Sequence, residues 1–152
     1  MIYVDTNIFI YSIENHPRYG RSCKKILEDI ESEKLKAFCS VLILAELINV
    51  LKKLNTILSK QGKKELSIKD NIAAVLSLPI TWIDLDFLTI ETASAYTFDM
   101  NGVDYIHIAS MAINSIGEIL SADKDFDKVN MIKRTDPLRY RPVRSSDSTA
   151  AP

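Results

Sequence analysis

The chain has 152 residues, of which 47% are hydrophobic and 26% charged, as expected for one globular domain with a substantial core. A formal net charge of −1 excludes a uniformly basic nucleic-acid-binding protein, and two cysteines are too few for a disulfide framework or a zinc site. The chain shows no signal peptide and no apolar run long enough to span a bilayer, so we expect a cytoplasmic protein.

Short apolar runs alternate with longer segments of helical period, which is typical of a parallel sheet covered by helices. We predict strands at 2–4, 36–39, 80–85, 119–121 and 129–133, and helices at 7–13, 18–33, 40–54, 87–100 and 104–114. A further helix is expected to open with Ser67 or Asp70 as its N-cap and to end at Pro79. The helix at 40–54 is almost wholly apolar and should be buried on most sides. Residues 1–144 are expected to form a single domain, and the small, polar segment 145–152 a flexible tail.

Four carboxylates lie in or beside apolar segments. Asp5 follows the first predicted strand and Asp123 follows a later one, while Glu46 and Asp104 lie in the apolar stretches 41–48 and 102–109. An ionised carboxylate is costly to bury without a partner, so the four indicate a shared countercharge. Hard oxygen ligands without a histidine or cysteine set favour Mg²⁺ or Mn²⁺, and such an ion suits the hydrolysis of phosphodiesters.

Each of these acids also has a structural interpretation. Asp5, Asp104 and Asp123 could each cap the helix that follows, because aspartate is a favoured N-cap residue. Glu46 has mostly apolar neighbours three and four positions away, so capping does not explain it; a buried pair with a lysine or arginine would.

Several polar residues near the four acids have two interpretations each. Asp125 is either a further metal ligand or a solvated loop acid, and His107 either orients a ligand or is a hydrogen-bonded structural histidine. Ser121 could bond near the metal or only to the local backbone. Thr6 and Asn7 could cap the first helix or form hydrogen bonds near the metal.

The charges are distributed unevenly. Segment 52–70 has six lysines and two acids, and segment 124–144 has seven basic residues and three acids. No lysine or arginine lies between Lys69 and Lys124, where there are eight acids. Basic edges around an acidic centre would suit binding of a polyanion by its backbone; the alternative is two solvated helix faces.

Four motifs occur in order along the chain: Val4-Asp5-Thr6-Asn7, Ala45-Glu46-Leu47, residues 104–109 (DYIHIA) and residues 121–126 (SADKDF). Each motif is weak by itself. As an ordered set with apolar flanks, they resemble the PIN-domain ribonucleases, particularly the VapC-type toxins, over about residues 1 to 135. The lysine-rich segment at 60–64 and the basic stretch 139–144 depart from a minimal toxin of this type.

The resemblance implies a three-layer α/β/α sandwich with a mostly parallel sheet and a metal-dependent endoribonuclease that uses Mg²⁺ or Mn²⁺. Asp5, Glu46, Asp104 and Asp123 match the family's acidic quartet, as catalytic residues and metal ligands, and Asp125 matches an acid often found beside it. The resemblance also implies an RNA substrate, a cognate antitoxin in a VapBC-type toxin-antitoxin pair, and a homodimer.

Two other classes of protein remain open from the sequence. A non-catalytic PIN-like module would bind RNA or a partner protein, and its signature would be the loss of one or more of the acids, all of which are present. A phosphatase of the haloacid dehalogenase type also begins with a strand that ends in aspartate. It requires a second aspartate two residues later, where this chain has Asn7.

Overall fold

The computed structural model describes residues 1–142, so the predicted tail at 145–152 and the end of the basic stretch 139–144 lie outside the described part. Its elements, in chain order, are β1 (Ile2–Val4), α1 (Thr6–Ile13), α2 (Gly20–Glu31), β2 (Ala37–Ser40), α3 (Leu42–Lys60), α4 (Ile68–Ser77), β3 (Thr81–Ile83), α5 (Phe87–Ser94), α6 (Gly102–Ile113), β4 (Glu118–Leu120), the 3₁₀ helix η1 (Lys124–Lys128), β5 (Lys133–Thr135) and the 3₁₀ helix η2 (Pro137–Arg139).

The five strands form one sheet in the order β3-β2-β1-β4-β5, and every neighbouring pair is parallel. The chain adds β2 and β3 on one side of β1 and then returns to add β4 and β5 on the other. The point where the order reverses therefore lies between β1 and β4, and open parallel sheets bind ligands beyond the carboxyl ends of the strands at such a point. Val4 pairs with Leu120, so the residues that follow both strands emerge side by side there.

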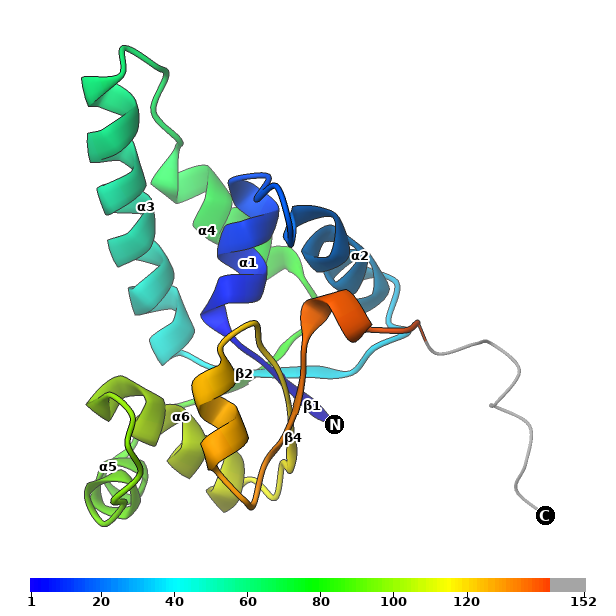
Figure 1. Ribbon diagram of the computed structural model, residues 1–152, viewed down its shortest axis with the longest axis vertical. Coiled ribbons are helices and arrows are strands. Elements are labelled where there is room, and N and C mark those ends of the chain that lie inside the picture. The colour runs from blue at the N-terminus through cyan, green and yellow to red at the C-terminus, as the bar shows by residue number, and fades with distance from the viewer. Residues whose placement is uncertain (143–152) are drawn as a thin grey trace, which may run out of the picture.

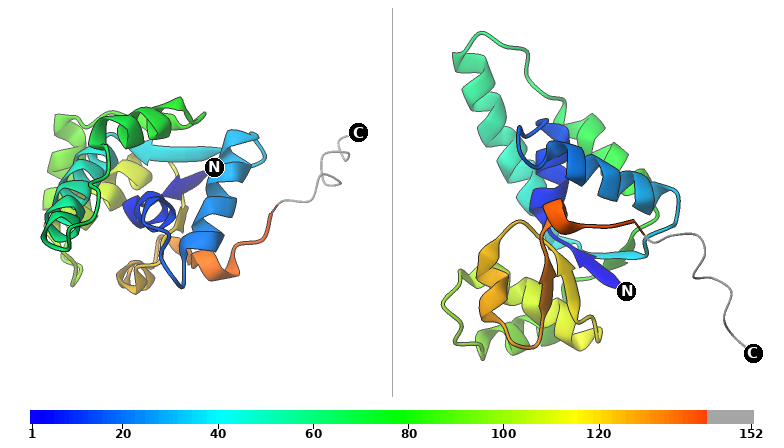
Figure 2. Two further views of the ribbon diagram at one scale, coloured as in Figure 1. Left: turned by 90° about the horizontal axis from the view of Figure 1, so that it is seen from above. Right: turned by 45° about the vertical axis from the view of Figure 1, so that its right-hand side comes forward.

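Helices cover both faces of the sheet, as the predicted three-layer α/β/α sandwich requires (Figures 1 and 2). α1, α2 and α4 lie on one face and α5 and α6 on the other, while α3 extends away from the sheet along α1 and α4. Buried apolar side chains from the strands and the facing helices form the core, among them Tyr3, Val4, Ile26, Ile119 and Leu120.

Most elements agree with the sequence predictions, but α5 ends at Ser94, six residues before its predicted end at about Met100. Three further elements differ. α3 continues six residues beyond the predicted end at Leu54, and only Ile43, Leu47 and Leu51 are buried on it, so the expectation of a helix buried on most sides was wrong. Because α3 extends away from the sheet (Figure 1), many of its apolar side chains have no element within residues 1–142 that covers them fully. The fifth strand begins at Lys133, where the predicted strand at 129–133 ends, because Val129 instead packs in the core after η1.

The third difference is at the start of α6. The Asn101 side chain accepts hydrogen bonds from the backbone N–H groups of Val103 and Asp104, so the helix begins at Gly102 and not at Asp104. Asp104 is thereby in the first turn of α6. Within residues 1–142, no helix combines the length and apolar character needed to cross a membrane.

Candidate active site

Asp5 lies directly after β1, at the reversal point of the sheet, and is 8% exposed. It caps α1, accepting the Thr6 backbone N–H at 2.7 Å. Its other oxygen, Oδ2, accepts from Asn7 Nδ2 at 2.6 Å and from Ser121 Oγ at 2.6 Å. Burial raises the pKa of the Asp5 carboxyl, and nearby His107 and the hydrogen bonds from Ser121 and Thr6 oppose that rise. The capping interpretation is confirmed, but it accounts for one oxygen only.

Glu46 lies on the second turn of α3, with its side chain 27% exposed, and both of its oxygens are held by partners from other elements. Thr6 Oγ1 donates to Oε2 at 3.0 Å, and His107 Nε2 bonds to Oε1. No lysine or arginine within residues 1–142 forms a salt bridge with Glu46. The sequence left open a buried pair of Glu46 with a lysine or arginine; in the structure the partner is His107 instead.

Asp104 enters the same region from α6, on the other face of the sheet. Partial burial and the negative charges of Asp5 and Asp123, with a smaller contribution from Glu46, raise the pKa of Asp104 to about 6. A like charge disfavours ionisation only when it lies close by. Asp5, Asp123 and Glu46 therefore all lie near Asp104. Asp104 does not cap α6, because Asn101 does.

Asp123 follows β4 and caps η1, accepting the Asp125 backbone N–H at 2.9 Å. Its own backbone N–H donates to Ser121 Oγ at 3.0 Å. The Ser121 hydroxyl thus links Asp123 to Asp5 across neighbouring strands. The Asp125 carboxylate instead pairs with Lys128 Nζ at 2.9 Å, which agrees with its interpretation as a solvated loop acid; its role as a metal ligand stays a prediction.

The carboxylates have the donor chemistry that Mg²⁺ or Mn²⁺ prefers, and their mutual repulsion is what a cation would relieve. Among residues 1–142, however, no three acidic, histidine or cysteine side chains converge closely enough to hold one ion as they stand. The oxygens of Asp5 and Glu46 accept hydrogen bonds from neighbouring side chains. The residues fit a hard divalent cation in type and charge, and binding one requires the carboxylates to move closer together. Each carboxylate oxygen has two acceptor sites, so Glu46 can bind an ion while it keeps its bonds to His107 and Thr6.

Sequence reasoning missed Tyr3. The Tyr3 hydroxyl is buried under the acids, accepts the Ser40 backbone N–H at 3.1 Å and bonds to His107 Nδ1 at 2.7 Å. Side chains two apart on a strand point to the same face, so the spacing of Tyr3 and Asp5 was a usable signal. Asn7 is also more involved than predicted, because it contacts Asp5, Ser121 and the Ala122 backbone.

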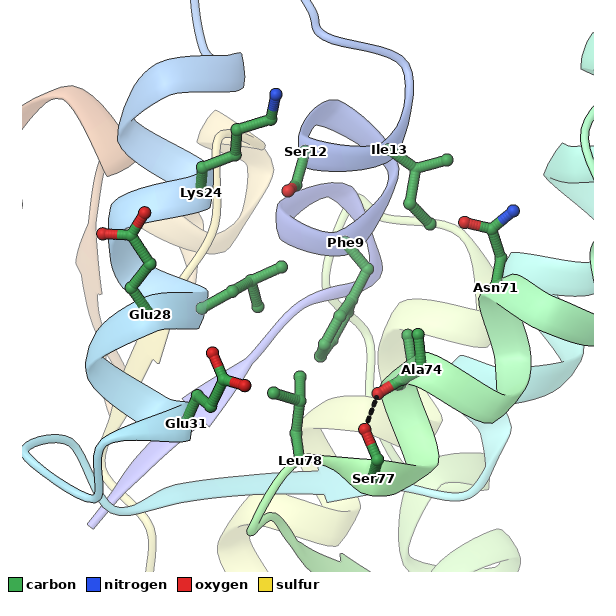
Figure 3. Close-up of a pocket in the computed structure, with 12 residues that line it drawn as sticks. Phe9, Ser12, Ile13, Lys24, Glu28, Glu31, Asn71, Ala74, Ser77 and Leu78 are labelled. Carbon is green, nitrogen blue, oxygen red and sulfur yellow. Dashed lines mark hydrogen bonds between the residues drawn. The ribbon is translucent and has the colours of Figure 1, made fainter.

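A separate hollow of about 370 Å³ lies between α1, α2 and α4. Figure 3 shows Phe9 and Leu78 inside it, with Lys24, Glu28 and Glu31 along α2 at its rim. None of the four acids lines it, so this recess is distinct from the acidic cluster.

The sequence and structural comparisons agree with this geometry. The family model of the PIN domain matches residues 2–131, so the chain belongs to the PIN domain family, whose members are nucleases. No curated protein matches the chain in sequence.

The fold also matches solved toxin structures. A toxin-antitoxin complex from Klebsiella pneumoniae is 18% identical with a TM-score of 0.63, covering 90% of this chain and 98% of that one. VapBC2 from Rickettsia felis, bound to a DNA fragment from its promoter, is 19% identical with a TM-score of 0.64 and coverages of 90% and 98%. VapC20 from Mycobacterium tuberculosis, a toxin that cleaves the sarcin-ricin loop, is 16% identical with a TM-score of 0.63 and coverages of 86% and 95%. At these identities the likeness establishes a shared fold.

Proposed function

We propose that the protein is a metal-dependent endoribonuclease and the toxin of a VapBC-type toxin-antitoxin pair. The observation that carries this proposal is geometric: Asp5 and Asp123 follow neighbouring strands at the reversal point of the sheet and are linked by the Ser121 hydroxyl, with Asp104 close to both. Within residues 1–142, no lysine or arginine pairs with Asp5, Glu46, Asp104 or Asp123. Membership of a nuclease family and the toxin fold support the same function.

In this proposal Asp5, Glu46, Asp104 and Asp123 hold Mg²⁺ or Mn²⁺, with Asp125 as a further candidate ligand. The ion, when bound, supplies activation of water and neutralisation of charge on the phosphate. The remaining polar residues orient the acids: Ser121 and Asn7 hold Asp5, and Thr6 holds Glu46.

The test is cleavage of single-stranded and structured RNA by the purified protein in Mn²⁺ or Mg²⁺. We expect Asp5→Asn to reduce the rate by about 100-fold or more, because metal stabilisation of the transition state amounts to several kcal/mol. Asp70→Asn makes the same change of charge at an exposed position on α4 and should cleave like wild type. If wild type cleaves no RNA, or Asp5→Asn equals wild type, the proposal fails; RNA binding in EDTA without cleavage in metal would instead favour a non-catalytic module.

The surface of α3 supports RNA as the substrate. Lys53 and Lys60 follow Glu46 by seven and fourteen residues, so at 3.6 residues per turn all three lie along nearly one line of the helix. At 1.5 Å per residue, the lysines stand about 10 and 21 Å along the axis from Glu46. Both lysines are exposed, and no acid lies between Leu47 and Lys60. We infer that this line of α3 holds the RNA backbone as it leaves the acidic cluster.

The matched comparison uses lysines at the opposite edge of the sheet. Lys34 and Lys36 are exposed and precede β2, whereas the acids follow the carboxyl ends of the strands. In the Asp5→Asn background, replacing Lys53 and Lys60 together by alanine should weaken RNA binding and flatten its dependence on salt, because fewer counterions are released. The Lys34 and Lys36 double alanine variant should bind as before. If the two double alanine variants bind RNA with equal affinity, α3 is not part of the RNA-binding site.

We also propose a partner antitoxin, which is supported by the solved neighbours, several of which are toxin-antitoxin complexes. The most direct test is the neighbouring gene. A short reading frame next to this one, encoding a protein that copurifies with this chain and inhibits its cleavage of RNA, would establish the pair. A neighbouring product that neither binds nor inhibits would count against toxin status and leave the nuclease proposal intact.

We also propose a homodimer. The start of α5 exposes four large apolar side chains within six residues, and Phe87 is 96% exposed. Large apolar side chains gathered on the surface often mark interaction sites in soluble proteins. Sedimentation should show a dimer for wild type and a monomer for Phe87→Glu; the same mass for both proteins would exclude this surface as the dimer contact.

A further inference from the structure

A buried chain of hydrogen bonds runs beneath the acidic cluster and ends on Glu46. The Ser40 backbone N–H donates to the Tyr3 hydroxyl at 3.1 Å, and that hydroxyl bonds to His107 Nδ1 at 2.7 Å. On the far side of the ring, His107 Nε2 bonds to Glu46 Oε1. Thr6 Oγ1 holds the other Glu46 oxygen at 3.0 Å. These hydrogen bonds join β1, β2, α6 and α3, four elements that are distant in sequence.

The donors and acceptors in this series of hydrogen bonds require His107 to donate the bond to Glu46. An ionised carboxylate can only accept, so His107 Nε2 carries a hydrogen. In the neutral ring, the Tyr3 hydroxyl then donates its proton to Nδ1. In the charged ring, Nδ1 donates to the Tyr3 oxygen instead. Nε2 therefore donates to Glu46 in either state of the ring.

Glu46 differs from the other three acids in having one more torsion than aspartate. Its side chain, 27% exposed, is also not held in place by burial. Nearby Asp5 and Asp104 carry the same charge, which would push a free glutamate outward into solvent. Two donors on two different elements oppose that movement.

We propose that His107 is a positioning residue that holds Glu46 toward the acidic cluster, and that Tyr3 fixes the His107 ring for this task. The inference rests on the proposed metal site. Packing alone does not account for the arrangement, because an apolar side chain would fill the same buried position without a polar group to satisfy. Tyr3 is fully buried and His107 is 1% exposed, yet the polar atoms of both side chains have partners.

The test measures Mn²⁺ binding by calorimetry in the absence of RNA, so it does not depend on activity. His107→Leu fills the buried position with an apolar side chain of similar size and removes the N–H donor. We expect it to weaken Mn²⁺ binding about 10- to 100-fold, as for other residues that orient metal ligands. His107→Gln keeps an N–H donor near the position of Nε2. It should retain most of the wild-type affinity, a rescue that a purely structural role would not produce.

A second pair of variants separates Tyr3 from general effects of a lost hydroxyl. Tyr3→Phe removes the group that fixes the His107 ring. Tyr140→Phe removes a hydroxyl that donates to Asp29 at 3.0 Å, away from the acids. We expect Tyr3→Phe to weaken Mn²⁺ binding several-fold and Tyr140→Phe to leave it unchanged.

The outcomes that overturn the inference are specific. His107→Leu that binds Mn²⁺ like wild type would overturn it, as would His107→Gln that binds no better than His107→Leu while both unfold cooperatively. If His107→Leu does not fold, the two tyrosine variants decide, and equal Mn²⁺ affinity in them overturns the role of Tyr3 and His107. A wild-type protein that binds no Mn²⁺ would overturn the proposed metal site and this inference together, whereas failure of the variants alone leaves the metal site standing.

Discussion

Two regions of the molecule contain buried carboxylates, and they treat the negative charge in opposite ways. Asp29 on α2 is 1% exposed, pairs with Lys25 Nζ at 3.0 Å and accepts the Tyr140 hydroxyl at 3.0 Å. In the acidic cluster, Asp5 is 8% exposed, and the partners bonded to its carboxylate are Thr6, Asn7 and Ser121, none of which is charged.

The difference separates an acid with a structural role from the acids for which we propose a role in metal binding. At Asp29 the protein supplies its own cation, one helical turn away on the same helix, and the charge is balanced within the fold. At the acidic cluster, burial and the negative charges of Asp5 and Asp123 raise the pKa of Asp104 to about 6. Burial of a carboxylate alone is therefore weak support for a metal site; burial without a cationic partner is the informative observation.

The largest expected effect is that of a metal ion on stability. A ligand that binds only the folded protein, at about 100 times its dissociation constant, adds about 2.7 kcal/mol to the free energy of unfolding, or about 5–10 °C in Tm for a chain of this size. We expect millimolar Mn²⁺ to produce such a rise in scanning calorimetry. Asp29→Asn should show the same rise and Asp104→Asn a smaller one. A melting curve unchanged by Mn²⁺ would break the distinction between the two regions.

The next effect is the cost of disturbing the balanced acid. Asp29→Asn removes the ion pair with Lys25 and weakens the bond from Tyr140, so we expect the free energy of unfolding to fall by about 1–2 kcal/mol, since Lys25 is half exposed. Urea denaturation at pH 7 in EDTA measures this change. A gain in stability would instead show that Lys25 does not balance the charge of Asp29.

The last effect is similar in size to that of Asp29→Asn, but it has the opposite sign and depends on pH. The pKa of Asp104 in the folded protein, about 6, lies above its ordinary value of 3.8, so the folded state holds a proton more tightly than the unfolded state. Stability from this group is therefore lost as the pH rises from about 4 to about 6. In EDTA, Asp104→Asn should be about 1–2 kcal/mol more stable than wild type at pH 7.

The same variant supplies its own control at low pH. Near pH 4 wild-type Asp104 is largely protonated in the folded state, so the gain from Asp104→Asn should shrink toward zero in urea denaturation. A gain that is equal at pH 4 and pH 7 would show that repulsion among the acids is not its cause.

Local pattern was enough to predict most of the fold. β1 was predicted at its observed bounds, and Ser67 was correctly placed among the candidates for the cap of α4, because these signals depend on residues near in sequence. The end of α3 and the position of β5 were wrong. Those boundaries depend on which apolar residues find packing partners, as Val129 does in the core, and a single sequence does not contain that information.

The candidate site shows the same division. Asp5, Glu46, Asp104 and Asp123 were chosen for their apolar settings and motifs, and the structure gathers them in one neighbourhood. The roles of their supporting residues were left open or missed. Tyr3 and His107 are 104 residues apart, and no local pattern indicates that their side chains meet.

What the sequence determined by itself is the inventory: alternating strands and helices, and four acids that apolar surroundings set apart from solvated ones. Only the tertiary structure decided which strands are neighbours, that Asp29 pairs with a lysine while none of the four acids pairs with a lysine or arginine of residues 1–142, and that His107 bonds to Glu46. The physical reason is that hydrophobic periodicity acts along the chain, over one or two helical turns, whereas charge balance and hydrogen bonding act through space.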